Sequence, residues 1–254
     1  MGLYREDAVV LRTYRLGEAD RIIVLMTAGR GKVRAVAKGV RRTKSRFGSR
    51  LEPPTHLRAM LYEGRQLDTI TQVETIDPFR HLRGDLERTT DALALVESVD
   101  QVAQEGEANA ALFRMLTRAL HALDEQRSPL LVASFYWKLL ALEGVAPVVE
   151  VCARCATPGI GTGVVPPTGE ETAPVAELVA FDPVEGGALC RTCRRGVALL
   201  PGVIEVIRRV YGGDLAAVLA TEEGPVAAQV CELATISLEH HLERRLRVLR
   251  LLAP

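Results

Sequence analysis

The sequence predicts an α+β protein in which a small closed β-barrel precedes a set of helices. Three observations carry this prediction. Short stretches rich in Val, Ile, Thr and Tyr, separated by Gly, Asp or Pro, fill the chain as far as Asp77. Apolar residues recur at helical spacing after Pro78. Two C-x-x-C pairs interrupt that helical pattern. The length of 254 residues corresponds to roughly 1.7 domains of ordinary size.

Residues 1–79 are assigned to the barrel. The five predicted strands are DAVVLRTYRLG, DRIIVLMT, GKVRAVAKG, THLRAMLYEG and RQLDTITQVETI. A long connection, RRTKSRFGSRLEPP, separates the third from the fourth. Five short strands with one long connection suit a closed barrel of the OB-like or the SH3-like kind, and the strand pattern does not choose between them.

Residues 80–149 are predicted to form a helical domain. Two apolar stripes indicate its first two helices: Leu82, Leu86, Leu93, Val96 and Val99, then Leu112, Phe113, Leu116, Leu120 and Leu123. A third helix is expected between Ser128, as its N-cap, and Gly144, where a C-terminal stop is expected, with Pro129 in the first turn. Its sequence is apolar almost all round, so we expect Trp137 to lie in a core.

Residues 150–197 hold the pairs Cys152–Cys155 and Cys190–Cys193. Each pair presents two thiolates to one ion, and two pairs complete a closed tetrahedral site, so the spacing predicts one structural Zn²⁺. Nearby cations offset the thiolate charge (Arg154, Arg191, Arg194 and Arg195), and a glycine follows each pair (Gly159 and Gly196). Redox dithiols or buried unligated cysteines are the alternatives. The fifth cysteine, Cys231, is expected to be a small core residue.

The Gly-, Pro- and Thr-rich residues 156–179 are expected to form a flexible loop within this zinc finger. Residues 198–254 are expected to pack with the helical domain. A short helix is predicted near residues 203–211, with a break at Gly212–Gly213, and a long helix from Pro225 to beyond Leu249. Its last turns carry Arg244, Arg245, Arg247 and Arg250, which complement the helix dipole or, alternatively, contact DNA or a partner.

Charge is unevenly distributed along the chain. Ten basic and no acidic residues lie between Arg21 and Leu51, whereas the whole chain has 32 Lys and Arg against 32 Asp and Glu. The remainder therefore holds 22 bases and 32 acids, a net charge of about −10. Apolar residues alternate through the start of the basic stretch (Ile22, Val24 and Met26, then Val33, Ala35 and Ala37), as in half-buried strands with charged outer positions. A nucleic acid is the favoured partner.

The predicted DNA contacts are clustered cations without accompanying Asn or Gln, which favours binding of phosphates over reading of bases. They are Arg30, Lys32, Arg34, Lys38, Arg41, Arg42, Lys44 and Arg46. Phe47 lies among them and is expected either to stack on an unpaired base or to anchor the connection on the barrel.

Other functional classes find no support in the sequence. It has no nucleotide-binding, nucleophile-elbow or metalloprotease motif, so no enzyme is predicted. It has no apolar stretch of about 18 residues and no signal-peptide pattern, so a cytoplasmic, nucleoid-associated protein is expected.

Two stretches carry a resemblance to a known family. DRIIVLMTAGRGKVRAVAKGVRRTKSRFGSRLEP resembles the N-terminal region of the RecO family of bacterial DNA repair proteins, and FDPVEGGALCRTCRRG, after CARC, resembles its zinc-bearing part. The order of barrel, helices, cysteine pairs and final helix also matches, over essentially the whole chain. The resemblance implies an OB-fold joined to a helical domain with an inserted zinc finger.

The same resemblance implies functions and partners. These are binding of single- and double-stranded DNA, annealing of complementary strands, and partnership with RecR and single-stranded DNA-binding protein. The outcome in the family is displacement of that protein from DNA and loading of the RecA recombinase. An RNA-binding or ribosome-associated zinc module is the alternative, because a basic barrel with a zinc knuckle serves either nucleic acid.

Overall fold

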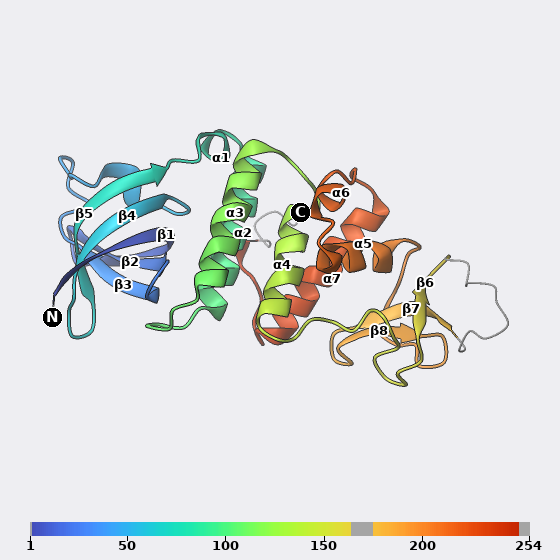
Figure 1. Ribbon diagram of the computed structural model, residues 1–254. Helices are drawn as coiled ribbons and strands as arrows, with labels where there is room; N and C mark the ends of the chain where they lie inside the picture. Colours follow the sequence, from blue (N-terminus) through green and yellow to red (C-terminus); the bar gives the residue numbers. More distant parts are fainter. Residues whose placement is uncertain (1, 164–174, 249–254) are drawn as a thin grey trace. The chain divides into compact units, whose positions relative to one another are not determined.

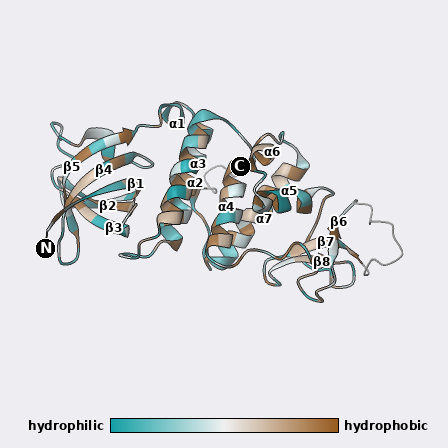
Figure 2. Cartoon of the chain, in the orientation of Figure 1, coloured by the Kyte–Doolittle hydropathy of each residue, from teal (hydrophilic) through white to brown (hydrophobic). Residues whose placement is uncertain are grey.

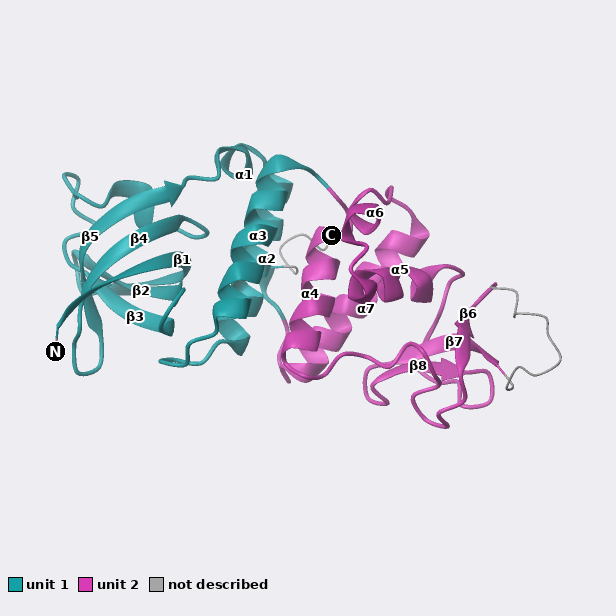
Figure 3. Ribbon diagram, viewed as in Figure 1, with its two compact units in different colours: residues 1–127, 246–254 teal, residues 128–245 magenta. Residues whose placement is uncertain are grey.

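The computed structural model describes residues 2–163 and 175–248. The chain divides into two compact units, residues 1–127 with 246–254 and residues 128–245 (Figure 3). Among the described residues, the first unit contains the barrel and three α-helices, and the second contains four α-helices and the cysteine segment. The division between the units falls at residue 127, within residues 80–149, which the sequence predicts as one helical domain.

Five strands close into the barrel (Figure 1). They are β1 (Leu3–Leu16), β2 (Asp20–Thr27), β3 (Gly31–Ala37), β4 (His56–Tyr62) and β5 (Asp68–Asp77). The order around the barrel is β1-β2-β3-β5-β4, and β1 pairs with β4 to close it. Strands β3 and β5 pair in parallel, whereas the other neighbours are antiparallel. The predicted barrel is confirmed, and this order is the OB-like one.

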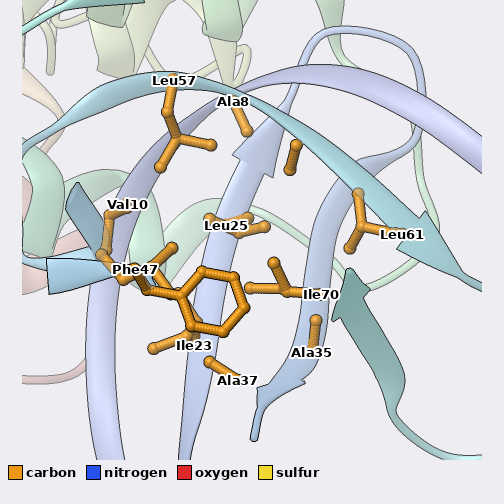
Figure 4. Packing of buried hydrophobic residues seen from close by; sticks show 12 residues of the cluster. Ala8, Val10, Ile23, Leu25, Ala35, Ala37, Phe47, Leu57, Leu61 and Ile70 are labelled. Atoms are coloured by element: carbon orange, nitrogen blue, oxygen red, sulfur yellow. The ribbon is translucent and has the colours of Figure 1, made fainter. Parts of the chain in front are cut away.

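The barrel interior is a continuous apolar core (Figure 4). Ile23 and Leu25 of β2 point into it, together with Ala35 of β3. The predicted phase of β2 is therefore wrong: Val24 and Met26 face outward but are still buried. From Ile23 to Thr27 the residues on both faces of β2 are buried, which explains why this part of the strand is apolar on both faces.

Three helices complete the first unit: α1 (Arg80–Gly84), α2 (Leu86–Val102) and α3 (Ala110–Glu125). Helix α2 contacts β1 and α3. Asp85 and Asn109 cap α2 and α3 by accepting from backbone N–H groups at 3.1 and 2.9 Å. In the predicted stripe, Val96 and Val99 are buried, but Leu86 at the start of α2 is 76% exposed. Both helices carry hydrophobic and hydrophilic residues (Figure 2).

The second unit contains α4 (Leu131–Leu142), α5 (Val203–Gly212), α6 (Leu215–Leu219) and α7 (Pro225–His241). Helix α4 packs against α5 and α7, and Trp137 is fully buried, as predicted. The helix starts later than predicted, and Ser128 Oγ accepts from Leu130 N at 3.3 Å ahead of its first turn. Gly144 has a φ of 79°, and Val145 N bonds Leu140 O at 2.9 Å, the backbone pattern of a glycine-terminated helix.

The predicted C-terminal helix is wrong in length. Helix α7 ends at His241, and Glu243 has a left-handed φ of 49°, so the arginines from Arg244 onward do not lie in its last turns. Leu246 is buried in the first unit, where Arg247 N and Val248 N donate to the Glu97 carboxylate at 3.0 and 2.9 Å. Arg250 lies outside the described residues.

The cysteine segment contains a small sheet of β6 (Gly159–Gly161), β7 (Ala176–Asp182), β8 (Gly187–Cys190) and β9 (Val197–Ala198). Strand β7 pairs with the other three. The predicted flexible loop of residues 156–179 is therefore wrong at both ends, where β6 and β7 pair in parallel. The middle of that prediction, residues 164–174, lies outside the described residues.

Candidate metal centre and nucleic-acid interface

Two tight turns position the four cysteines of the C-x-x-C pairs. In the first, Cys152 N donates to Thr157 O and Ala156 N donates to Cys152 O, both at 2.8 Å. In the second, Cys190 ends β8, and Cys193 N donates to Cys190 O at 3.1 Å. Gly196 follows with a φ of 77°, and a Cβ there would lie 2.3 Å from a backbone carbonyl oxygen. Glycine is required at this position because only it combines that φ with so close an approach.

The four thiols meet at one point. Their Sγ atoms all lie within 4.8 Å of one another, and the Cys155 and Cys190 Sγ atoms are 3.8 Å apart. A tetrahedral site with Zn–S bonds of about 2.3 Å has S–S edges of about 3.8 Å, so the cluster has the size of such a site. Cys152 and Cys190 are buried, whereas Cys155 is exposed. The donor set fits a closed metal site.

The surroundings favour thiolates. Burial acts to raise the pKa of Cys152, but backbone N–H groups, that of Cys190 first, lower it to about 6. The Thr157 hydroxyl lowers the pKa of Cys155. Burial and the neighbouring thiols raise the pKa of Cys193, because several thiolates cannot share so small a volume without a counter-charge. A bound cation would supply that charge.

Two of the arginines beside the cysteines have carboxylate partners of their own. Arg191 lies 2.6 Å from Glu177, and Arg195 lies 2.7 Å from Asp182. These two therefore hold the turns to the sheet as well as adding positive charge near the thiols. Cys231 stands apart on α7; it is half-buried, less than predicted, and its thiol donates to Pro129 O at 3.2 Å.

The first part of the basic stretch is held by acidic residues of the same unit. Lys32 Nζ lies 2.8 Å from Asp100 O and 3.7 Å from Asp100 Oδ1, and its side chain is only 16% exposed. Arg34 lies 3.6 Å from Glu105. Arg30 lies 3.4 Å from Glu63, with its guanidinium 3.8 Å from the centre of the Tyr4 ring. These three predicted contacts already have structural partners.

The second part is free of such partners. Five of the predicted contacts lie in the connection between β3 and β4, residues 38–55, where they are exposed and form no ion pair with any described residue: Lys38, Arg41, Arg42, Lys44 and Arg46. Arg41 donates to the carbonyl oxygens of Gly17 and Glu18 at 3.3 and 2.9 Å. The positive charges of these five side chains are therefore available to bind an anionic ligand.

Apolar side chains fix the connection to the barrel. Phe47 is 2% exposed and Leu51 is 1% exposed, and both belong to the barrel core. Figure 4 shows the Phe47 ring among the other core side chains. Gly39 N donates to Asp20 Oδ1 at 2.7 Å, and Arg41 N donates to Ala19 O at 2.9 Å, which ties the connection to the β1–β2 turn. Phe47 is therefore the anchor of the connection, and its ring is not available to a base.

Tyr14 is not among the residues that the sequence predicts to bind DNA. This residue is 44% exposed on the outer face of β1, where Arg12 donates to its hydroxyl at 2.9 Å. The short turn between β1 and β2 sets their register and places Tyr14 opposite Ile22. This register is the signal from which the sequence could have predicted that Tyr14 has an apolar neighbour on the adjacent strand.

Comparison with known proteins covers both units. Residues 1–79 match the family model described as "Recombination protein O N terminal", and residues 83–250 match "Recombination protein O C terminal". A relative, "DNA repair protein RecO" from Nocardioides sp. (strain ATCC BAA-499 / JS614), is 42% identical across 96% of this chain and 97% of its own length. Among the described residues, the helices are too short or too polar to cross a membrane.

Proposed function

The chain belongs to the RecO family, and we propose that it is a DNA-binding recombination mediator in DNA repair. In this proposal the chain anneals complementary strands and helps to load a recombinase onto DNA coated by single-stranded DNA-binding protein. Its direct partners would be DNA, RecR and that coating protein, with RecA affected indirectly. The relative's name and the family models support the repair role; the finer steps rest on the family resemblance.

The exposed cations of the 38–55 connection are the observation that carries this proposal. Five cations on one anchored connection, without carboxylates to neutralise them, form a site for a polyanion. They are Lys and Arg side chains without amide neighbours suited to reading bases, so they favour contacts with phosphates and binding that does not depend on sequence. The acidic remainder of the chain would direct DNA to this face.

Annealing follows from the same charge. Two complementary strands repel each other through their phosphates, and a shared basic surface lowers that repulsion while leaving the bases free to pair. Neutralisation of phosphates needs no chemical energy, and the sequence has no nucleotide-binding motif. The annealing rate should therefore be the same with and without ATP.

A zinc ion is proposed for the cysteine cluster. Cys152, Cys155, Cys190 and Cys193 would hold it, and it would supply a cross-link between the two turns rather than an open coordination position for catalysis. This role supports the assignment of a non-enzymatic protein.

The proposal is tested by measuring the affinity for single-stranded DNA as a function of salt. If all five cations contact phosphates, log K should fall against log salt with a slope of roughly −3.5, at about −0.7 for each phosphate. Substitution of Lys38, Arg42 and Lys44 by Glu should reduce the slope to roughly −1.4 and nearly abolish binding. These three are chosen because Arg41 also bonds the β1–β2 turn.

A matched control carries the same charge change elsewhere. Arg80, Arg114 and Arg118 are exposed on α1 and α3, and their substitution by Glu should leave the slope near the wild-type value. Circular dichroism should show both variants folded. Unchanged binding by the connection variant, or equal losses in both variants, would contradict the proposed site. Tighter binding of a matched RNA than of DNA would favour the RNA-binding alternative.

A further inference from the structure

The outer face of the barrel contains a row of apolar side chains across three strands. Tyr14 of β1 pairs with Ile22 of β2, and Ile22 pairs with Val36 of β3. Side chains alternate along a strand, and the adjoining Ile23 and Ala35 point into the barrel core, so this row points outward. Tyr14 is 44% exposed, and the other two are half-buried.

The next row of the same face, on the side away from the β1–β2 turn, is covered. Arg12 of β1 pairs with Val24 of β2, and Val24 pairs with Arg34 of β3. Val24 is buried, Arg12 forms an ion pair with Asp100 at 2.5 Å, and Arg34 faces Glu105. The end of α2 and the residues after it therefore cover the barrel up to this row and leave the Tyr14 row open.

Free positive charge borders the open row. Lys38 follows Val36 by two residues along the chain, and Arg41 is bonded to the turn that follows β1. Lys38 and Arg41 of the 38–55 connection thus lie at the same end of the barrel as Tyr14. Arg12 lies 5.7 Å from the centre of the Tyr14 ring and bonds its hydroxyl, which holds the ring in one orientation on the strand.

We propose that Tyr14, with Ile22 and Val36 beside it, is a stacking platform for an unpaired base of single-stranded DNA. The inference rests on the proposed DNA-binding function, whose phosphate contacts would hold the backbone on the adjacent connection. A base freed from a duplex exposes its ring face, whereas a paired base has its faces covered by its neighbours. The platform therefore adds affinity for single strands and none for duplexes, and does so for any base.

Tyr62 provides a matched control for Tyr14. It is a tyrosine of similar exposure, 48%, on β4 of the same barrel, where it pairs with Leu3. Tyr62 is the last residue of β4, whereas the connection leads into the first residue of that strand, His56. Tyr62→Ala removes the same ring from the barrel surface without touching the proposed platform.

The test compares the affinities of Tyr14→Ala, Tyr14→Phe and Tyr62→Ala for an oligo-dT strand and for a duplex of equal length. Tyr14→Ala should weaken binding of the single strand by about five- to a hundredfold and leave duplex binding within about twofold. Tyr14→Phe keeps the ring but loses the bond from Arg12, and should bind the single strand nearly as well as the wild type. Tyr62→Ala should bind both DNAs normally.

A direct signal checks the stacking itself. Tyr14→Trp adds an indole at the platform, and its fluorescence should be quenched by oligo-dT, whereas the buried Trp137 of the wild type should respond little. Unchanged single-strand affinity of Tyr14→Ala, or equal losses on single strand and duplex, would overturn the inference. The Lys38, Arg42 and Lys44 variant separates the two proposals: if it loses binding while Tyr14→Ala does not, the platform fails and the DNA-binding site stands.

Discussion

Two parts of the chain hold irregular segments in place by different means. The 38–55 connection of the barrel is held by Phe47 and Leu51, which are buried in the barrel core. The two turns of the cysteine segment are instead brought together by four thiols within 4.8 Å of one another. Apolar anchors form as part of folding, whereas thiolates so close together need a cation. The 38–55 connection and the cysteine segment should therefore respond to different perturbations.

The largest expected effect is on the cysteine segment. Cys190→Ser removes one of four ligands, and structural zinc sites of this kind contribute about 10–16 kcal/mol of apparent binding energy at neutral pH. The variant should lose its metal and its protection from hydrogen exchange between residues 150 and 163, while the barrel amides keep theirs. Metal analysis and exchange mass spectrometry measure the two effects. Zinc-free wild-type protein purified without chelator would contradict the prediction.

The next effect concerns the apolar anchor. Phe47→Ala should lower the free energy of opening of the barrel by about 3–5 kcal/mol, because it leaves a cavity in the core. Hydrogen exchange of the barrel amides measures this loss, and zinc content should not change. Phe47→Leu is the control and should cost less than half as much. A full loss of DNA affinity with unchanged barrel stability would instead show that Phe47 contacts DNA.

The two regions also differ in how far the sequence alone could describe them. The spacing of the cysteines was sufficient to predict the four-thiol cluster, because a metal site depends on a few ligands at short separations. The four thiols do lie together in the structure. The barrel strands were found because Gly, Asp and Pro mark their ends. The sequence could not predict which cations lack an acidic partner. Lys32 and Lys44 look alike in the sequence, but the fold brings Asp100 to Lys32.

Other errors have the same origin in tertiary contacts. The sequence places Val24 and Met26 on the inner face of β2, but they lie on the outer face and are buried there, which the pattern of one strand cannot show. The end of α7 was misjudged because Leu246 leaves the helix to be buried in the first unit. Tyr14 was overlooked because exposure on a strand depends on what packs over its neighbours.

A smaller effect on DNA binding is expected to distinguish a cation that already has an acidic partner from one that has none. Lys44→Ala should reduce the magnitude of the salt slope of DNA binding by about 0.7, since Lys44 is exposed and has no ion-pair partner among the described residues. Lys32→Ala should change the slope by much less, because its ammonium group already bonds Asp100. Salt titrations of the two variants measure the difference. Equal changes in slope would show that Lys32 exchanges Asp100 for phosphate when DNA binds.

The smallest expected effect is a pH dependence of the barrel. His56 begins β4, directly after the 38–55 connection, and neither of its ring nitrogens has a hydrogen-bond partner among the described residues. Burial, and then the neighbouring His121, lowers the pKa of His56 below its usual value of 6.5. Above pH 6.5 the ring is mostly neutral in both the folded and the unfolded chain, so its protonation does not change the stability of the barrel.

As the pH falls below the usual value, the unfolded chain takes up a proton that the folded chain resists, and the barrel loses stability. His56→Leu should therefore make barrel stability in urea less dependent on pH between about 7.5 and about 5.5. The cysteine segment also weakens in acid, because protonated thiols release metal, but His56→Leu should leave that release unchanged. If barrel stability depends on pH identically in wild type and variant, His56 can be protonated within the fold. If the variant also retains its metal at lower pH than the wild type does, the two regions are not independently stabilised.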